Sequence, residues 1–348
     1  MQEGGPDLDV AISTRVRLAR NVGSYAFPCL ASDTDTGEML DKVKSLFNEQ
    51  GAFTDFKLWP MGDLSSIEKR SLVEKHLISP GLLNGSSNGA LMVRNDEAIS
   101  VLINEEDHFR IQAILPGLQL EEALVITNEL DDIIEERFDY AFDHNIGYLT
   151  ACPTNIGTGL RSSVMLHLPG MIMTRQFKRL LNTLSQVGLM VRGLYGEGTE
   201  IVGNMVQISN QVTLGHTEEE IINNLHAITC QIIEQEKSAR QMLLDRNRMG
   251  MADKAWRAYG LLKYAQAISS QEAISLLSDL RLGFDLGLVK GIDYGLLNQM
   301  LVIVRPGSLQ LIVGKELDHK QRSIERAIQI KEVLDRYPDR RIESEDNE

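Results

Sequence analysis

The sequence has few cysteines, and none lies in a pattern typical of a metal site or a disulfide framework. Its 348 residues include Cys29, Cys152 and Cys230. No Cys-x-x-Cys pair occurs, which argues against a zinc module, and three widely spaced thiols do not form an even set of disulfide bonds. A reducing compartment such as the cytoplasm is therefore expected. The first residues also lack the basic and apolar regions of a signal peptide.

Long apolar runs and an excess of positive charge are missing as well. No uninterrupted run reaches the roughly 18 apolar residues needed to cross a membrane. The chain carries 35 basic and 49 acidic residues, and 35 minus 49 gives a formal charge of -14. Proteins that bind nucleic acid by neutralising its phosphates usually have the opposite balance. We expect neither a membrane segment nor direct binding of nucleic acid.

Several common catalytic motifs are absent too. The sequence has no Gly-x-x-x-x-Gly-Lys-Ser/Thr loop, no His-Arg-Asp with Asp-Phe-Gly pair and no His-Glu-x-x-His motif. P-loop enzymes, eukaryote-type protein kinases and common zinc hydrolases are thereby disfavoured. Gly157 and Gly159 match only the start of a dinucleotide fingerprint. No protein metal site is expected.

Hydrophobic periodicity predicts an α+β fold, an antiparallel sheet flanked by helices and followed by a small all-helical domain. Strand patterns occur at residues 8–20, 90–94, 98–104, 189–191 and 205–209. Helical patterns occur at residues 34–50, 65–79, 120–138, 174–187, 217–247, 252–268, 270–282, 293–304 and 317–336. The expected limits are a catalytic domain at 8–239, a helical domain at 240–337 and an acidic tail at 338–348.

The stretch from Cys152 to Arg161 is the hardest part of the sequence to explain as packing. It reads Cys-Pro-Thr-Asn-Ile-Gly-Thr-Gly-Leu-Arg and combines a thiol, two glycines and an arginine. Glycines allow a backbone to approach a ligand closely, and guanidinium groups match phosphate oxygens. This mixture indicates a phosphate-binding turn beside a reactive centre. A cysteine-protease site would need a histidine partner, and the sequence does not rank His108, His144 or His167 for that role.

Other charged segments leave two interpretations open. Arg15 and Arg17 emerge from one face of a strand, either as a solvated edge or as a phosphate clamp. The acidic run before Arg110 is either a solvated hairpin tip or a carboxylate base held near an arginine. The glycine-containing loop at 192–200 is either a long hairpin or a loop that closes over a ligand.

Four of these segments together resemble the active-site blocks of the phosphagen (ATP:guanidino) kinases, in the same order along the chain. They are Ser13-Thr-Arg-Val-Arg17, Asn104-Glu-Glu-Asp-His-Phe-Arg110, Cys152 to Arg161, and Arg192-Gly-Leu-Tyr-Gly-Glu197. The resemblance implies the family's antiparallel sheet, ATP as phosphoryl donor, and Mg²⁺ bound mainly through the phosphates of ATP.

The resemblance also implies roles for individual residues. Glu106 would be the catalytic base, Glu197 would orient the acceptor guanidinium, and Cys152 would lie beside the reacting nitrogen. The implied nucleotide-binding residues are Ser13, Thr14, Arg15, Val16, Arg17, His76, Arg110, Arg161, Ser162, Ser163, Val164, Met165, Arg192, Gly193, Leu194, Tyr195, Gly196 and Glu197.

Two features are similar to the bacterial protein-arginine kinase branch of the family, the McsB type. The first arginine block begins at residue 13, which leaves no room for the N-terminal helical domain of the kinases of free creatine or arginine, and a helical domain follows the catalytic one. One block departs from this branch. Its phosphoarginine-sensing motif, Arg-Asp-x-x-Arg-Ala, is present as Arg322-Ser323-Ile-Glu-Arg326-Ala327. Loss of the acid puts allosteric sensing at Arg322, Ser323 and Arg326 in doubt.

The expected function is ATP-dependent phosphorylation of arginine side chains in proteins, which marks them for Clp-protease degradation in a stress response. The implied partners are arginine-containing substrates such as a stress-gene repressor, a zinc-finger activator, a Clp chaperone-protease and a second copy of the chain. One alternative is a kinase of free arginine or another small guanidino compound. A second alternative is an inactive adaptor that binds phosphoarginine.

Overall fold

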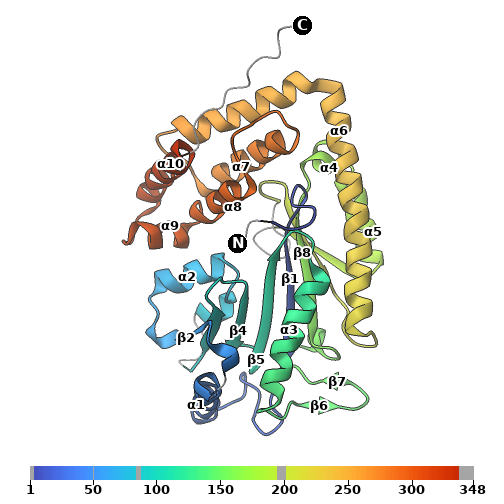
Figure 1. The fold of residues 1–348 in the computed structure, drawn as a ribbon, viewed down its shortest axis with the longest axis vertical. Coiled ribbons are helices and arrows are strands. Elements are labelled where there is room, and N and C mark those ends of the chain that lie inside the picture. The colour runs from blue at the N-terminus through green and yellow to red at the C-terminus, as the bar shows by residue number, and fades with distance from the viewer. Residues whose placement is uncertain (1–3, 50, 84–87, 194–200, 337–348) are drawn as a thin grey trace. The chain divides into compact units, whose positions relative to one another are not determined.

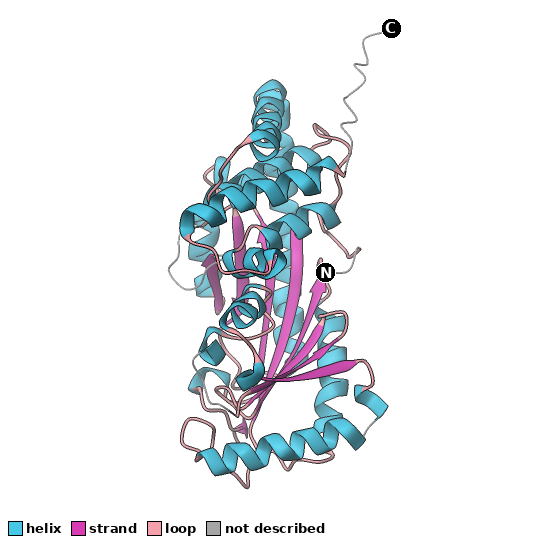
Figure 2. Ribbon diagram, turned by 90° about the vertical axis from the view of Figure 1, so that its left-hand side faces the viewer, coloured by secondary structure: helices cyan, strands magenta, loops and turns pink. Residues whose placement is uncertain are grey.

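A computed structural model of the chain describes residues 4–49, 51–83, 88–193 and 201–336. Eight of its strands form one sheet in the order β2-β3-β4-β5-β1-β8-β10-β9, and the strands twist along the sheet (Figure 2). They are β1 (Ala11–Arg20), β2 (Phe56–Pro60), β3 (Ala90–Arg94), β4 (Ile99–Ile103), β5 (Phe109–Pro116), β8 (Leu160–His167), β9 (Leu189–Gly193) and β10 (Met205–Asn210). A separate small sheet pairs β6 (Phe142–Asp143) with β7 (Gly147–Tyr148). The predicted antiparallel sheet is confirmed.

Helices flank the sheet and make up most of the chain after it. They are α1 (Asp33–Glu49), α2 (Ser66–Glu74), α3 (Leu120–Glu135), α4 (Pro169–Met173), α5 (Phe177–Gln186), α6 (Glu218–Tyr264), α7 (Ser270–Asp285), α8 (Tyr294–Ile303), α9 (Pro306–Val313) and α10 (His319–Asp335). Short 3₁₀ turns are η1 (Gly51–Phe53), η2 (Met61–Asp63), η3 (Pro80–Leu83) and η4 (Pro153–Asn155). The capping boxes expected at Ser65, Thr217 and Ser269 are all present.

One face of the central strands is covered by helix α3, which packs along β1 and β5 (Figure 1). Side chains that alternate onto this face are fully buried, among them Val16 and Leu18 of β1 and Ile111 and Ala113 of β5. Because side chains alternate along a strand, the residues between them lie on the opposite face. That opposite face contains the candidate site.

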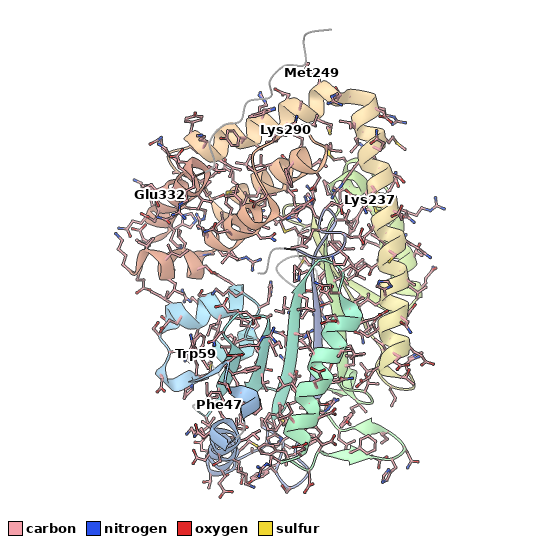
Figure 3. All side chains as sticks on the ribbon, in the orientation of Figure 1. Phe47, Trp59, Lys237, Met249, Lys290 and Glu332 are labelled. Carbon is pink, nitrogen blue, oxygen red and sulfur yellow. The ribbon has the colours of Figure 1, made fainter. Side chains whose placement is uncertain are left out.

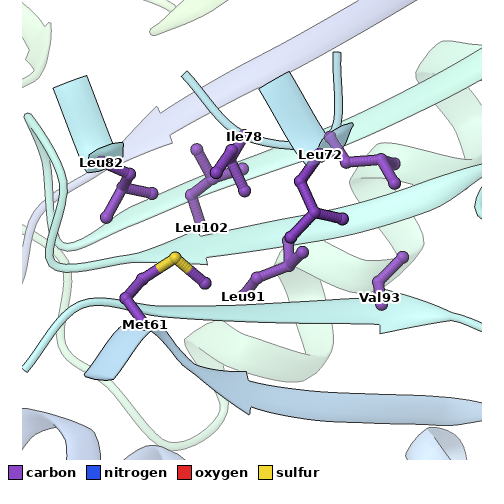
Figure 4. Close-up of a cluster of buried hydrophobic side chains, with 8 residues drawn as sticks. Met61, Leu72, Ile78, Leu82, Leu91, Val93 and Leu102 are labelled. Atoms are coloured by element: carbon purple, nitrogen blue, oxygen red, sulfur yellow. The ribbon is translucent and has the colours of Figure 1, made fainter. Parts of the chain in front are cut away.

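The outer part of the opposite face is covered by an apolar cluster (Figure 4). Leu72 of α2 and Leu82 of η3 meet Leu91 of β3 and Leu102 of β4 there. Leu102 stands directly opposite Arg110 of β5 in the strand register. The face therefore changes from apolar on β3 and β4 to strongly cationic on β5, β1 and β8.

The helix predicted over residues 65–79 ends earlier, at Glu74. Lys75 is the C-cap, and His76 has a φ of +61°, in the left-handed region. The amide of Leu77 then donates to the carbonyl of Leu72 at 2.9 Å. The apolar periodicity continues past the helix because Leu77 and Ile78 fold back into the same cluster.

Helix α6 is longer than predicted and is bent. Asn247 lies inside it with non-helical angles (φ -155°, ψ 65°). Figure 1 shows the helix turning sharply, and Met249, labelled in Figure 3, lies at the turn. The predicted helix end at Asn247 was thus a bend, after which the helix continues to Tyr264. Helix α9 was not predicted, because its short pattern continues that of α8 with only Val304 and Arg305 between them.

The chain divides into two compact units. Unit 1 comprises residues Met1–Leu166, Leu181–Val191 and Gln207–Gln231, and unit 2 comprises His167–Leu180, Arg192–Val206 and Ile232–Glu348. Unit 2 therefore includes short segments that precede the helical part in sequence. The limits 8–239, 240–337 and 338–348 remain a prediction about domains, and the proposed acidic tail lies wholly outside the described residues.

No single helix in the described ranges is long and apolar enough to span a membrane. The pair Tyr294–Ile303 and Pro306–Val313 meets a length and composition test only when the two helices are joined across a 90° bend.

Candidate active site

Strand β1 presents two arginines on the face opposite α3. Arg15 and Arg17 are half-buried, whereas Thr14, Val16 and Leu18 between and beside them are fully buried. The alternation follows from the two-residue repeat of a strand. The predicted shared face of Arg15 and Arg17 is confirmed.

The strand register adds two more arginines to this face. Arg17 stands directly opposite Arg161 of β8, and Ala19 stands opposite Arg110 of β5. Residues directly opposite on neighbouring strands point to the same side. Arg15, Arg17, Arg110 and Arg161 therefore share one face of three adjacent strands. We call these four residues the arginine face.

Side chains of β9 and β10 extend this surface. Nη2 of Arg15 donates to Oε1 of Gln207 at 3.4 Å, and Nη2 of Arg161 lies 3.9 Å from Sδ of Met190. Arg192 follows Met190 by two residues on β9, so alternation places both side chains on the same side of that strand. Gly193 ends β9. The predicted residues Leu194, Tyr195, Gly196 and Glu197 lie outside the described residues.

The remaining predicted nucleotide contacts divide between the two faces. Ser13, opposite Met165, and Ser163, opposite Arg15, share the side of the arginines. The side chains of four others point to the buried side and can reach a nucleotide only through their backbone: Thr14, Val16, Ser162 and Val164. Oγ1 of Thr14, for example, donates to the carbonyl of Gly117 at 2.7 Å.

His76 is held beside the arginine face by its backbone. Nε2 of Gln112 donates to the carbonyl of His76 at 2.8 Å, and Gln112 stands opposite Arg17 in the register. Gln112 also donates to Oγ of Ser100. The predicted proximity of His76 to the site therefore depends on a glutamine that the sequence did not single out, because glutamine carries no charge signal.

The turn between β4 and β5 contains the predicted base, and its flanking residues are fixed. Asn104 has a φ of +54°, and its Nδ2 donates to the carbonyls of Thr36 at 2.8 Å and Asn88 at 3.0 Å. Oγ of Ser79 donates to Oε1 of Glu105 in a short hydrogen bond. We call residues 104–107 the base turn.

Glu105 and Glu106 share one guanidinium. Nη1 of Arg110 lies 2.8 Å from Oε2 of Glu105, and Nη2 lies 2.9 Å from Oε2 of Glu106. The side chain of Glu106 is 40% exposed, while that of Glu105 is 11% exposed. Glu106 is thus the more accessible of the two carboxylates, and Arg110 connects it to the arginine face. The sequence pointed to Glu106 alone, although the adjacent Glu105 was visible in it.

Cys152 lies at the N-terminal end of η4. Its thiol is half-buried, and Sγ lies 3.0 Å from Oγ1 of Thr154. The backbone carbonyl of Cys152 accepts a hydrogen bond from Oγ1 of Thr150 at 2.8 Å. A thiol beside a small hydroxyl can accept a hydrogen bond from a polar nitrogen of a substrate, or donate one to it.

The two glycines of this stretch approach the protein's own backbone. Gly157 has a φ of +110°, and an added Cβ would lie 2.7 Å from the carbonyl oxygen of Thr213. Gly159 has a φ of +68°, and its Cβ would lie 2.6 Å from the carbonyl oxygen of Ala19. The sequence had suggested close approach to a ligand. The observed contacts instead fix the turn against β1 and the segment after β10.

The three residues of the proposed allosteric site lie on α10. Nε of Arg326 donates to the carbonyl of Val304 at 2.6 Å, and its Nη1 donates to that of Ile268 at 2.8 Å. Nη1 of Arg322 donates to the carbonyl of Leu317 at 2.7 Å, and Oγ of Ser323 donates to that of His319. Arg326 is buried and joins α8, α10 and the turn before α7.

Two family models match the chain. ATP:guanido phosphotransferase, C-terminal catalytic domain, matches residues 38–239, and Protein-arginine kinase McsB C-terminal domain matches residues 248–345. Together they cover the sheet except β1, and most of the helical part that follows it.

Curated relatives match over nearly the whole chain. A protein-arginine kinase of Desulforamulus reducens is 50% identical over 337 residues, covering 96% of this chain and 94% of its own length. One of Halalkalibacterium halodurans is 49% identical over 335 residues, with the same coverage.

Solved structures of guanidino kinases share the fold. A duplicated taurocyamine kinase from Schistosoma mansoni, with bound transition state analog components, matches with a TM-score of 0.60 and 28% identity, over 66% of this chain and 33% of that one. A lombricine kinase matches with a TM-score of 0.59 and 23% identity, over 68% of this chain and 69% of that one.

Proposed function

The chain belongs to the ATP:guanido phosphotransferase family, and from this premise we propose that it is an ATP-dependent kinase of arginine side chains in proteins. The observation that carries the proposal is the arginine face with Glu106 joined to it through Arg110. The similarity to relatives named protein-arginine kinase supports a protein acceptor, because it extends through the helical part of the chain.

The arginine face supplies the binding site for the phosphates of ATP. Guanidinium groups directly opposite one another repel, and an anion bound between them offsets that repulsion. A triphosphate provides that neutralisation, and planar guanidinium forks match its oxygens. Arg192 would add a fifth cation from β9. In phosphoryl transfer most of the rate enhancement comes from such positioning and charge stabilisation.

Glu106 is the group placed to accept a proton from the acceptor. The attacking guanidinium nitrogen loses a proton to the Glu106 carboxylate as its bond to the γ-phosphorus forms. The bond between that phosphorus and the bridging oxygen breaks, and ADP leaves. Cys152 would hold the reacting nitrogen through Sγ, and Glu197 would hold the other side of the planar guanidinium. The product is a phosphoramidate.

Magnesium would enter with ATP. Among the residues that the structure describes there is no cluster of three or more metal-ligating side chains. Mg²⁺ commonly keeps several waters and binds through substrate phosphates, and ATP held by the arginine face would present those phosphates to it. When bound, the ion would reduce the negative charge on the transferred phosphoryl group.

The acceptor class is tested by offering both acceptors at once. The purified chain is incubated with labelled ATP, free arginine and an arginine-containing protein, and the label in each is counted after separation. We expect label on the protein, with little on the amino acid. Label only on free arginine would contradict the proposal and identify a small-molecule guanidino kinase. ATP-independent retention of a phosphoarginine protein, with no label transferred, would identify an adaptor.

The proposal extends to a cellular role and to assembly. Phosphorylated proteins, a stress-gene repressor among them, would pass to a Clp protease in the cytoplasm, with a zinc-finger protein as activator. The helical part would form a homodimer, which sedimentation at micromolar concentration tests directly. At Arg322, Ser323 and Arg326, phosphoarginine sensing would require both arginines to leave the carbonyls they now contact. Added free phosphoarginine should therefore leave the kinase rate unchanged.

A further inference from the structure

Two buried polar side chains meet behind the base turn. Asn21 follows the last residue of β1, and Asp107 is the last residue of the base turn; both side chains belong to residues only 1% exposed. Nδ2 of Asn21 donates to Oδ1 of Asp107 at 2.6 Å. Neither side chain points to solvent, so the pair is a fixed internal contact.

The same carboxylate oxygen also holds the segment that carries the thiol. The backbone amide of Ala151 donates to Oδ1 of Asp107 at 2.7 Å, and Nδ2 of Asn21 donates to the carbonyl of Leu149 at 3.1 Å. On the other side, Oδ1 of Asn21 accepts the backbone amide of His108 at 3.0 Å. Every one of these contacts restrains backbone next to the site.

The positions of these contacts relate the two chemical groups. Glu106 immediately precedes Asp107, and Cys152 immediately follows Ala151. Asp107 is therefore the sequence neighbour of the proposed base, and its Oδ1 accepts a hydrogen bond from the sequence neighbour of the thiol residue. Among the hydrogen bonds of the described side chains, none joins the base turn to a residue nearer to η4.

The carboxylate is retained at a cost. Burial raises the pKa of Asp107, and its second oxygen, Oδ2, has no hydrogen-bond partner in the described structure. A buried acceptor without a partner costs about 1–3 kcal/mol. An apolar residue would avoid this cost, but it would leave the backbone amide of Ala151 without the acceptor that Oδ1 provides.

We propose that Asn21 and Asp107 are positioning residues that set the separation of Glu106 and Cys152. We call the pair the brace. Neither residue touches substrate; the brace acts by holding the backbone on both sides of the acceptor nitrogen. The inference rests on the proposed roles of Glu106 and Cys152, and it deepens them by giving their relative placement a structural cause.

The first test replaces Asn21 by alanine in the full chain. We measure kcat, the KM for ATP, and the rate at which iodoacetamide alkylates Cys152 without substrate, with peptide mass spectrometry separating Cys152 from Cys29 and Cys230. We expect kcat to fall about 10- to 100-fold, because misplacement of about 1 Å costs up to that much. The KM for ATP should change less than about twofold, and the alkylation rate should change at least about threefold.

Asp107→Ala and Asp107→Asn provide a matched pair. Alanine removes the shared acceptor, whereas asparagine keeps an acceptor oxygen and places its NH₂ where Oδ2 has no partner. We expect asparagine to restore most of the alkylation rate and kcat lost with alanine. A loss equal in both variants would overturn the proposal and assign the effect to the negative charge.

The control is Asn298→Ala, which removes a buried asparagine (6% exposed) of α8 that contacts Arg281. It should lower the midpoint of thermal unfolding while leaving kcat and thiol alkylation per folded molecule unchanged. The brace is refuted if Asn21→Ala keeps normal kcat, or loses kcat with Cys152 alkylated at the wild-type rate. The alkylation readout uses no phosphoryl acceptor, so it separates failure of the brace from failure of the proposed protein acceptor.

Discussion

At the scale of single residues, the site gathers like-charged side chains on one face of the sheet. Four arginines share one face of β1, β5 and β8, with Arg17 directly opposite Arg161. One of them, Arg110, is engaged by both Glu105 and Glu106. Such an arrangement is retained where binding of a charged substrate offsets its cost, as is common at functional sites.

Glu106→Gln tests the assignment of the base. Glutamine keeps the size of the side chain and can still contact Arg110, but it cannot accept the proton of the guanidinium. General base catalysis typically contributes about 10²- to 10⁴-fold, so we expect kcat for phosphoryl transfer to fall at least about 100-fold, with little change in the KM for ATP. Asp41→Asn, at an exposed site on α1, is the control. A Glu106→Gln enzyme with full activity would remove Glu106 from the mechanism.

Arg17→Lys tests the phosphate site. Lysine keeps the charge but loses the planar fork that binds two phosphate oxygens. We expect the KM for ATP to rise about tenfold or more, while the fold measured by circular dichroism is unchanged. Lys44, paired with Asp41 on α1, offers the reverse control as Lys44→Arg. An unchanged KM in the Arg17→Lys enzyme would show that the arginine face does not bind the nucleotide.

At the scale of secondary-structure elements, the turn from Gly157 to Gly159 connects η4 to β8. Its glycines have positive φ and touch the backbone of other segments. The close approach of Gly157 to Thr213 fixes one end of the stretch that begins at Cys152. The turn is thus a rigid support of the site.

Gly157→Ala should therefore destabilise the protein. A φ of +110° is strained for any residue with a Cβ, and the added methyl would meet the carbonyl of Thr213. We expect the free energy of unfolding to fall by more than about 1 kcal/mol. Gly260→Ala is the matched control, since Gly260 lies in α6 with open space around it. There the same substitution should stabilise the protein by up to about 1 kcal/mol.

Much of the element pattern was visible in the sequence. The strands 90–94 and 205–209 and three capping boxes were predicted correctly, because short apolar runs and Ser/Thr-x-x-Glu spacing are local signals. The end of α2 was missed, since Leu77 and Ile78 are buried by tertiary packing rather than by a helix. Strand β2 was not predicted because its five residues follow no clear alternation and are only partly buried.

For the candidate site, charged residues could be predicted from the sequence and neutral polar residues could not. The shared face of Arg15 and Arg17 was predicted because two-residue spacing along a strand places both side chains on one side; their binding of a nucleotide stays a prediction. Gln112, Ser79 and Asn21 were not predicted to lie near this face, because neutral polar side chains carry no signal until strand register brings them there. The sequence also did not show what the two glycines contact, because a glycine allows close approach either to a ligand or to the backbone of the chain itself.

At the scale of the whole molecule, each compact unit has a buried histidine. In unit 1 burial lowers the pKa of His108 to about 4, and the rings of Tyr25 and Phe27 lie at its edges. In unit 2 burial together with Arg240 and Arg281 lowers the pKa of His167 well below its usual value. Both histidines are neutral in the folded protein at pH 7.

His108 should make the fold sensitive to acid. Its pKa falls from an ordinary 6.5 to about 4 on folding, so its contribution to stability is present above pH 6.5 and is lost as the pH falls toward 4. Urea unfolding at pH 7 and pH 5 should show the wild type losing about 2 kcal/mol more than His108→Gln. Equal losses in the two proteins would show that His108 does not contribute.

The central claim is that the arginine face and Glu106 transfer phosphate from ATP to arginine side chains of a protein. The direct measurement is mass spectrometry, under non-acidic conditions, of an arginine-containing protein after reaction with ATP and either the wild type or Glu106→Gln. The account predicts phosphoryl groups on arginine side chains with the wild type, and at least about a 100-fold lower yield with the variant. Phosphate found only on free arginine, or on serine, threonine or tyrosine, would contradict it.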